Sequence, residues 1–266
     1  MTVSSLTIDT DDRGVATITL NRAVIHNAFD DLMIAELLQA LEIVETDQRV
    51  RLLVLRAKGD SFSAGADLNW MRRVAAYDRD RNVCDAQALG LLLNTLDTLA
   101  RPTIARVQGA AYGGGVGLVS CCDIAIASEQ AIFSLSEVRL GLIPAVIGPY
   151  VVNAIGRRAA RRYFLTGERF DAREALRLGL VHRVVPHAEL DDAVAATIDT
   201  LGRGGPSAQA AAKRLIADIA GRPVDSDARE LTARRIADVR ASHEGKEGLD
   251  AFLNKRPPAW RKRTEG

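Results

Sequence analysis

Three short runs of the chain have apolar interiors, and they constrain the fold more than any other feature of the sequence. Residues 51–56 read RLLVLR, residues 102–107 read PTIARV, and residues 123–127 read DIAIA. A strand with one face in water alternates apolar and polar residues, whereas a continuous apolar run is typical of a parallel strand covered on both faces. The runs therefore predict an α/β fold built on a buried, mostly parallel sheet.

The rest of the chain alternates strand and helix patterns and then becomes helical only. Further strands are expected at residues 14–20, 131–134 and 180–185. Apolar residues three and four positions apart predict helices at residues 27–46, 68–77 and 84–100. Beyond Pro186, helices are expected at residues 188–203, 206–220, 225–242 and 244–253. We therefore divide the chain into a core of residues 1–200 and a helical C-terminal region of residues 201–266, joined at residues 202–205.

The charges of the chain nearly cancel, because 35 lysines and arginines stand against 34 aspartates and glutamates, for a formal net charge of +1. Nucleic-acid binders usually show a basic excess, so no nucleic-acid partner is expected. The N-terminus lacks a charged-then-apolar signal pattern, and no apolar run is long enough to span a membrane. We expect a cytoplasmic protein without a membrane partner.

The cysteines and histidines give no sign of a metal site. Neither a CxxC nor an HxxxH spacing occurs among the three cysteines and four histidines. The adjacent Cys121 and Cys122 are expected to fill core space instead. Four arginines between residues 157 and 162 have the spacing of one helix face, which we interpret as solvated or as a subunit interface.

Two glycine-rich loops carry the strongest functional signal. Residues 61–68 read SFSAGADL and residues 109–118 read GAAYGGGVGL, and each segment follows an apolar strand and leads into a helix. Small residues let a ligand approach the main chain, and N–H groups at a helix start have no intrahelical acceptor. Two such loops facing each other would supply two donors to one oxygen, which is an oxyanion hole made of backbone. Asp67 is expected to stabilise the start of the helix after the first loop.

The glycines have other interpretations as well. A glycine run alone also fits a flexible turn or tight helix packing. No Gly-Lys-Ser/Thr follows the second loop, so it is not a Walker P-loop. A dinucleotide fingerprint starting at Gly113 and Gly115 would need a third glycine where Leu118 stands. The chain also lacks the GxSxG pattern of a serine hydrolase.

The two loops and several later segments resemble the enoyl-CoA hydratase/isomerase (crotonase) superfamily. Residues 63–68 (SAGADL) and 108–115 (QGAAYGGG) resemble its two oxyanion-hole motifs. The segments DIAIA, SE at 136–137 with GLIP at 141–144, FLTG at 164–167 and FLNKR at 252–256 match in the expected order. The resemblance extends from about residue 8 to residue 256.

This resemblance implies a crotonase-like spiral of ββα turns with a C-terminal helical trimerisation region, assembled as a homotrimer or hexamer. The implied oxyanion donors are the N–H groups of Ala66 and Gly114. An acyl-CoA thioester is the implied substrate, with coenzyme A as part of it and no separate cofactor. The resemblance places coenzyme A against a set of five residues: Val24, Ile25, His26, Ala64 and Lys255. Lys255 would approach the phosphates from the same or a neighbouring subunit, although it fits a solvated tail cation equally well.

One catalytic position departs from the family pattern. Hydratases of the family typically use two glutamates, and the second of these matches Glu137. The first should fall two residues after the GGG run, where this chain has Gly117. With one carboxylate, Glu137 can activate water and return the proton to C2, or a substrate carboxylate or ordered water can replace the missing acid. Alternatively, Glu137 can move a proton between C2 and C4, which is Δ3,Δ2-isomerase chemistry.

Local matches favour a branched substrate. Residues 64–71 (AGADLNWM) and 143–152 (IPAVIGPYVV) resemble bacterial methylglutaconyl-CoA hydratases and isohexenylglutaconyl-CoA relatives. Many members have a diglycine where this chain has Val146 and Ile147, and bulk there would reshape the acyl pocket. The leading hypothesis is therefore a lyase that hydrates a branched 2-enoyl-CoA. The alternatives are an isomerase that uses Glu137 alone and a catalytically weakened relative that binds acyl-CoA or a protein partner.

Overall fold

The computed structural model describes residues 5–261, and its strands form two sheets. The larger sheet has the order β1-β2-β3-β5-β7-β10, with β1 antiparallel to β2 and every other pair parallel. Its strands are β1 (Leu6–Thr10), β2 (Val15–Leu20), β3 (Leu52–Ala57), β5 (Thr103–Val107), β7 (Ile124–Ser128) and β10 (Arg183–Val185). The three apolar runs form β3, β5 and β7, which are neighbours in the sheet, so the parallel sheet predicted from them is confirmed.

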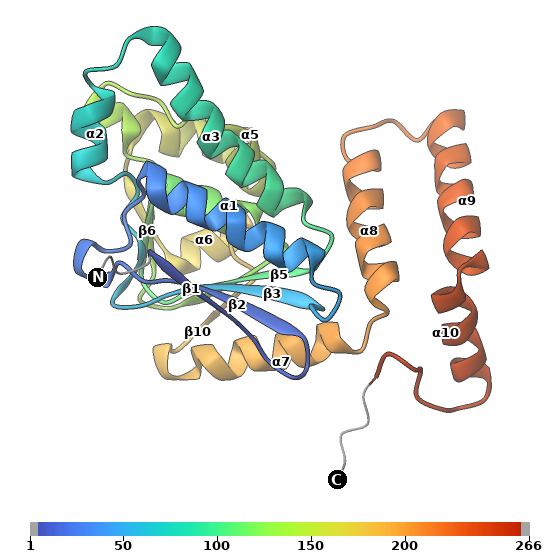
Figure 1. Cartoon of the computed structure of the whole chain (residues 1–266). Coiled ribbons are helices and arrows are strands. Elements are labelled where there is room, and N and C mark those ends of the chain that lie inside the picture. The colour runs from blue at the N-terminus through green and yellow to red at the C-terminus, as the bar shows by residue number, and fades with distance from the viewer. Residues whose placement is uncertain (1–4, 262–266) are drawn as a thin grey trace.

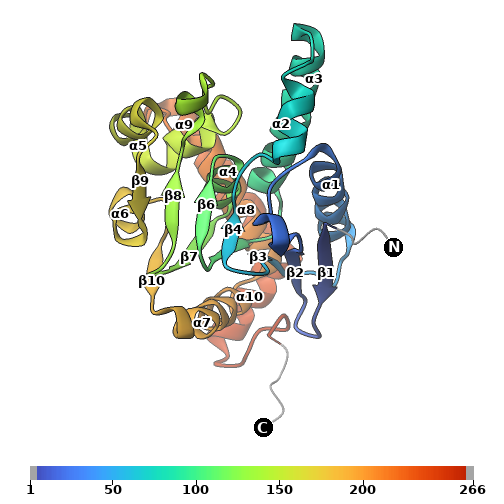
Figure 2. The same cartoon turned by 90° about the vertical axis from the view of Figure 1, so that its left-hand side faces the viewer.

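The smaller sheet has the order β4-β6-β8-β9 and lies next to the larger one (Figure 2). Its strands are β4 (Ser61–Ser63), β6 (Ala110–Tyr112), β8 (Ile132–Ser134) and β9 (Arg169–Asp171). The first three are parallel, and β9 runs antiparallel to β8. The sequence placed β4 and β6 inside loops. That assignment was wrong because strands of only three residues are too short to show a periodicity and form only through their mutual pairing.

The chain repeats one unit around the molecule. β3 is followed by β4, β5 by β6, and β7 by β8; the first strand of each pair joins the larger sheet and the second joins the smaller one. A helical segment closes each unit, and the predicted spiral of ββα turns is therefore confirmed. The helices are α1 (Asp31–Thr46), α2 (Leu68–Val74), α3 (Arg79–Thr98), α4 (Gly114–Cys121), α5 (Gly148–Thr166), α6 (Ala172–Leu178), α7 (Leu190–Gly202), α8 (Pro206–Ile219), α9 (Ser226–Ala241) and α10 (His243–Leu253).

Side-chain caps explain where the structure corrects the predicted helix starts. α1 begins at Asp31 rather than residue 27, because the Asp30 carboxylate accepts a hydrogen bond from the Met33 N–H. α3 begins five residues earlier than predicted, because Asp78 caps it through the Arg81 N–H. Strand β10 begins at residue 183 rather than 180, because Leu180 still donates its N–H to the Ala175 carbonyl at the end of α6.

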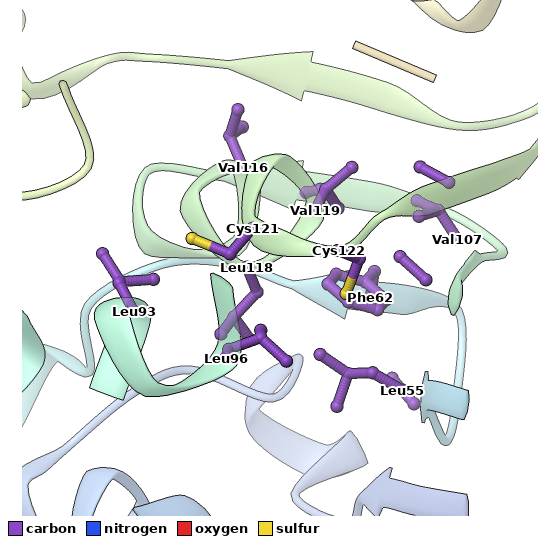
Figure 3. Close-up of a cluster of buried hydrophobic side chains, with 14 of the residues drawn as sticks. Leu55, Phe62, Leu93, Leu96, Val107, Val116, Leu118, Val119, Cys121 and Cys122 are labelled. Atoms are coloured by element: carbon purple, nitrogen blue, oxygen red, sulfur yellow. The ribbon is translucent and has the colours of Figure 1, made fainter. Parts of the chain in front are cut away.

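Helices cover both faces of the larger sheet (Figure 1). α1 and α3 pack together over one face, and α7 packs on β5 and β7 on the other. Cys121 and Cys122 lie in the main core with Leu55, Phe62 and Leu118, as Figure 3 shows, so their predicted packing role is confirmed. Burial raises the pKa of the Cys122 thiol to about 12. This thiol is therefore neutral at physiological pH.

The helices α8, α9 and α10 pack against one another beside the core (Figure 1). α8 is tied to the core by Lys213, whose Nζ lies 2.8 Å from the Asp123 carboxylate. No helix within residues 5–261 combines the length and the apolarity that a membrane crossing requires.

Candidate active site

The two glycine-rich loops meet because the strands that precede them pair. β4 and β6 are parallel, with Ser61 opposite Ala110, so their carboxyl ends lie at the same edge of the smaller sheet. Gly65 has a φ of +87°, and a Cβ on it would lie 3.1 Å from the Tyr112 carbonyl oxygen. A residue with a side chain would therefore be strained there and would crowd the second loop. The close approach of the loops depends on this glycine.

The N–H groups of Ala66 and Gly114 donate no hydrogen bond to any atom of residues 5–261. Ala66 forms an isolated parallel bridge with Phe29, in which the Phe29 N–H donates to the Gly65 carbonyl and the Asp67 N–H donates to the Phe29 carbonyl, both at 2.7 Å. Because successive amides of extended backbone point to opposite sides, the Ala66 N–H points away from Phe29. Gly114 is the first residue of α4, where an N–H has no intrahelical acceptor.

Glu137 lies beside the second loop. It opens the short helix η2 (Glu137–Leu140), which two residues separate from the end of β8, and its Oε1 lies 3.0 Å from where a Cβ on Gly113 would be. The side chain is partly buried, and Oε2 is buried without a hydrogen-bond partner within the described residues. Burial raises the pKa of this carboxyl above its ordinary value of 4.5. A carboxylate in that state is a stronger base than one in water.

The space beside Gly117, the position of the missing first glutamate, is occupied by the side chain of Ile147. Gly117 is buried in α4, and a Cβ on it would lie 2.5 Å from Cγ2 of Ile147 and 3.4 Å from the Leu93 side chain. Ile147 is only 3% exposed. The bulk noted in the sequence at residues 146–147 thus occupies the space into which a residue-117 side chain would extend. Gly117 itself contributes no functional group.

The segment assigned to coenzyme A lies next to the first loop. Val24 is 96% exposed, and Ile25 and His26 are also exposed. The His26 carbonyl accepts a hydrogen bond from the Ala64 N–H at 2.8 Å, and its Nδ1 lies 3.0 Å from Ser61 Oγ. The structure therefore brings Val24, Ile25, His26 and Ala64 together at the edge of the first glycine-rich loop.

Lys255 does not join this group within one chain. It is exposed and lies two residues beyond Leu253, the last residue of α10. Figure 1 shows α10 on the opposite side of the core from the segment between β2 and α1. A lysine from the same subunit is therefore disfavoured as the one that approaches the phosphates of coenzyme A.

Three polar residues that hold the loops were missed in the sequence. Asn27 is fully buried; its Nδ2 donates to the Lys58 and Ser61 carbonyls, and its Oδ1 accepts from the Arg22 N–H. The Arg22 guanidinium forms ion pairs with Asp30 at 2.7 Å and with Asp67 at 3.4 Å. An asparagine at the first position of a predicted helix was the available signal for this network, because its side chain competes for backbone hydrogen bonds.

Asp67 has the role expected from the sequence. Its carboxylate accepts hydrogen bonds from the Asn69 and Trp70 N–H groups at the start of α2. Because it directly follows Ala66, it also fixes the end of the first loop.

The arginines between residues 157 and 162 lie elsewhere. They are exposed on α5 and, with Arg177, line an open groove of about 740 Å³. The groove includes neither Glu137 nor a residue of the glycine-rich loops.

The chain is similar to known proteins along nearly its whole length. The crystal structure of an enoyl-CoA hydratase from Shewanella pealeana superposes with a TM-score of 0.94 at 48% identity, covering 96% of each chain. A 2,3-dehydroadipyl-CoA hydratase from Escherichia coli is 32% identical over 251 residues, 94% of this chain and 96% of that one. A trans-2-decenoyl-[acyl-carrier-protein] isomerase from Streptococcus mutans is 32% identical over 251 residues, 93% of this chain and 94% of that one. The family model for enoyl-CoA hydratase/isomerase matches residues 10–263, and the chain belongs to this family of acyl-CoA enzymes.

Proposed function

We propose that the protein hydrates a branched 2-enoyl-CoA of the methylglutaconyl-CoA type, with Glu137 as its only catalytic carboxylate. The observation that carries the proposal is the placement of this partly buried glutamate beside Gly113 in the second loop, where the next amide, that of Gly114, is unpaired, as is that of Ala66 in the facing first loop. Coenzyme A would lie along residues 24–26 and Ala64, which leads the thioester carbonyl to the two loops.

The proposed reaction proceeds through an enolate. Glu137 takes a proton from water as the water oxygen bonds to C3, and the C2–C3 π electrons shift toward the thioester oxygen. The N–H groups of Ala66 and Gly114 donate hydrogen bonds to that oxygen as its negative charge develops. The enolate then collapses, and C2 takes the proton from Glu137, so that one water has been added and the glutamate is again ionised.

Two features of the pocket support a branched acyl group. Ile147 fills the space beside Gly117, so no second protein carboxylate extends from that position. Val146 lies against α3, where its Cγ1 is 3.7 Å from where a Cβ on Gly90 would be. A pocket reshaped by these two side chains differs from that of a two-glutamate hydratase. The short matches to methylglutaconyl-CoA hydratases at residues 64–71 and 143–152 agree with this choice.

An isomerase is the second candidate, because a single carboxylate is sufficient for it. Glu137 would take a proton from C2 of a 3-enoyl-CoA and return it to C4, with the dienolate oxygen held by the same two amides. The isomerase of Streptococcus mutans belongs among the relatives of the chain, so the family itself allows both reactions.

Separate incubations with 3-methylglutaconyl-CoA and a 3-enoyl-CoA decide between the two reactions. We expect hydration of the first and little or no double-bond shift in the second; the reverse result would replace the hydratase by the isomerase. Glu137→Gln should abolish turnover, whereas Glu129→Gln, at an exposed glutamate after β7, should leave it unchanged. Tight coenzyme A binding without turnover of a broad thioester panel would favour a weakened relative that only binds acyl-CoA.

We also propose that the chain assembles as a homotrimer or hexamer through α8, α9 and α10. Exposed apolar side chains on these helices support this, including Ile216, Ile236, Leu249 and Phe252, the last at 80% exposure. Assembly would also allow Lys255 of one subunit to approach the coenzyme A site of another. Light scattering coupled to size-exclusion chromatography measures the subunit number, and a monomer would contradict the proposal.

A further inference from the structure

Phe29 touches the backbone of both loops that carry the unpaired amides. Its main chain brackets Ala66, through the 2.7 Å hydrogen bonds to the Gly65 carbonyl and from the Asp67 N–H. Its ring lies against the other donor, since a Cβ on Gly114 would be 3.0 Å from Cε2 and 3.1 Å from Cδ2 of Phe29. One residue therefore spans from the first amide to the second.

The surroundings of Phe29 hold it in place. The side chain is 1% exposed and belongs to the main core. Two residues before it, Asn27 is anchored by hydrogen bonds to Lys58, Ser61 and the Arg22 N–H. The residue after it, Asp30, caps α1 and pairs with Arg22. The main chain of Phe29 is therefore held from both sides, and its ring is enclosed by the core.

We propose that Phe29 is a positioning residue that sets the spacing of the Ala66 and Gly114 N–H groups. The inference rests on the proposed oxyanion hole and adds to it the element that fixes its width. An oxyanion hole requires donors about 2.7–3.1 Å from the charged oxygen. A misplacement of about 1 Å can reduce the rate about 100-fold. The length of the Phe29 ring is what keeps α4 at its distance from the first loop.

Shortening this side chain tests the proposal. Phe29→Leu should lower kcat by about 10- to 100-fold, while KM and the Kd for free coenzyme A change by no more than about 2-fold, because residues 24–26 are untouched. The carbonyl stretch of a bound 13C-labelled acyl-CoA should move back toward its value in water, because the hydrogen bonds to the oxygen lengthen. Phe170→Leu is the matched control: this phenylalanine is also buried but lies on the edge strand β9, separated from β6 by β8, where its ring packs on Phe133 and Tyr163, and its variant should keep the wild-type kcat and carbonyl frequency.

A second variant pair gives an independent readout. Gly114→Ala keeps the N–H but places a methyl group 3.0 Å from the ring, so it should displace the amide and lower kcat. Adding Phe29→Leu opens space for the methyl group, and the double variant should be more active than Gly114→Ala alone. Circular dichroism verifies folding, and Phe29→Met serves if Phe29→Leu does not fold.

The outcomes separate the inference from the proposed function. If the wild-type protein turns over thioesters and shifts the carbonyl band, and the Phe29 variants do both to the same extent, the role of Phe29 is overturned and the oxyanion hole is not. A drop in kcat equal in Phe29→Leu and Phe170→Leu would also overturn it. A wild-type protein that neither turns over thioesters nor shifts the carbonyl band would overturn both proposals.

Discussion

The contact between Gly117 and Ile147 makes a quantitative prediction about the missing glutamate position. Carbon atoms in contact prefer a separation of about 3.5–4.0 Å, and a Cβ at residue 117 would lie only 2.5 Å from Ile147 Cγ2. Overpacking of this kind costs about 1–3 kcal/mol. A Gly→Ala change within a helix would otherwise stabilise by about 1 kcal/mol. Gly117→Ala should therefore destabilise the protein, by up to about 2 kcal/mol.

Shortening the Ile147 side chain should remove the destabilising effect of Gly117→Ala. Ile147→Ala alone leaves a cavity and should cost about 2–5 kcal/mol. In that background Cγ2 is gone and the closest atom left is the Cβ of residue 147 at 3.1 Å, so adding Gly117→Ala should be close to neutral, with any gain below about 1 kcal/mol. Gly90→Ala is the control, because its nearest contact would be 3.7 Å away, at Val146, and it should stabilise in either background.

Urea unfolding followed by circular dichroism, at one protein concentration, gives the four free energies of this cycle. The prediction is a coupling between residues 117 and 147 larger than about 0.5 kcal/mol, the usual error of additivity. If Gly117→Ala destabilises equally in both backgrounds, then Ile147 does not occupy this space, and its role in excluding a second carboxylate is refuted.

Three further predictions concern Glu137 and the first loop. Glu137→Gln should lower kcat by about 100- to 10,000-fold and raise the melting temperature at pH 7. Burial raises the pKa of the Glu137 carboxyl, so folding favours its protonated form, and the wild-type protein loses stability as the pH rises through the folded pKa. The amide of the variant has no charge to bury and avoids this loss. A melting temperature below wild type at pH 7 would contradict that sign. The acid limb of kcat/KM should have unit slope and a midpoint above 4.5, since only ionised Glu137 accepts a proton; a midpoint at or below 4.5 would show that another group titrates. Asp67→Ala removes the cap of α2, which is worth about 1 kcal/mol, and should lower kcat more than it raises KM, whereas a change in KM alone would place Asp67 outside the positioning of Ala66.

The sequence predicted those parts of the fold that local patterns determine. Continuous apolarity identified β3, β5 and β7, because a strand buried on both faces is apolar along its own residues, whatever its neighbours are. The order of the spiral came from the family resemblance, which extends along nearly the whole chain. By contrast, β4 and β6 have three residues each and depend on their mutual pairing, which no local pattern encodes. The kink in α5 at Gly156, where φ is +74°, was not predicted from the surrounding residues either.

The candidate site divides in the same way. Its two glycine-rich loops, Glu137 and the departure at Gly117 were found from short motifs. What fills the space beside Gly117 was not, because Ile147 reaches it from another turn of the spiral. Phe29 was not found either, since a phenylalanine at the start of a predicted helix looks like ordinary core. Its significance lies in contacts with residues 65–67 and 114, which only the folded chain brings together.

A crystal structure with a saturated, branched acyl-CoA bound tests the central claim most directly. We expect the thioester oxygen about 2.7–3.1 Å from the backbone nitrogens of both Ala66 and Gly114, with the Glu137 carboxylate facing C2 and C3. A thioester oxygen bound elsewhere, or either N–H occupied by an acceptor within the protein, would contradict the claim.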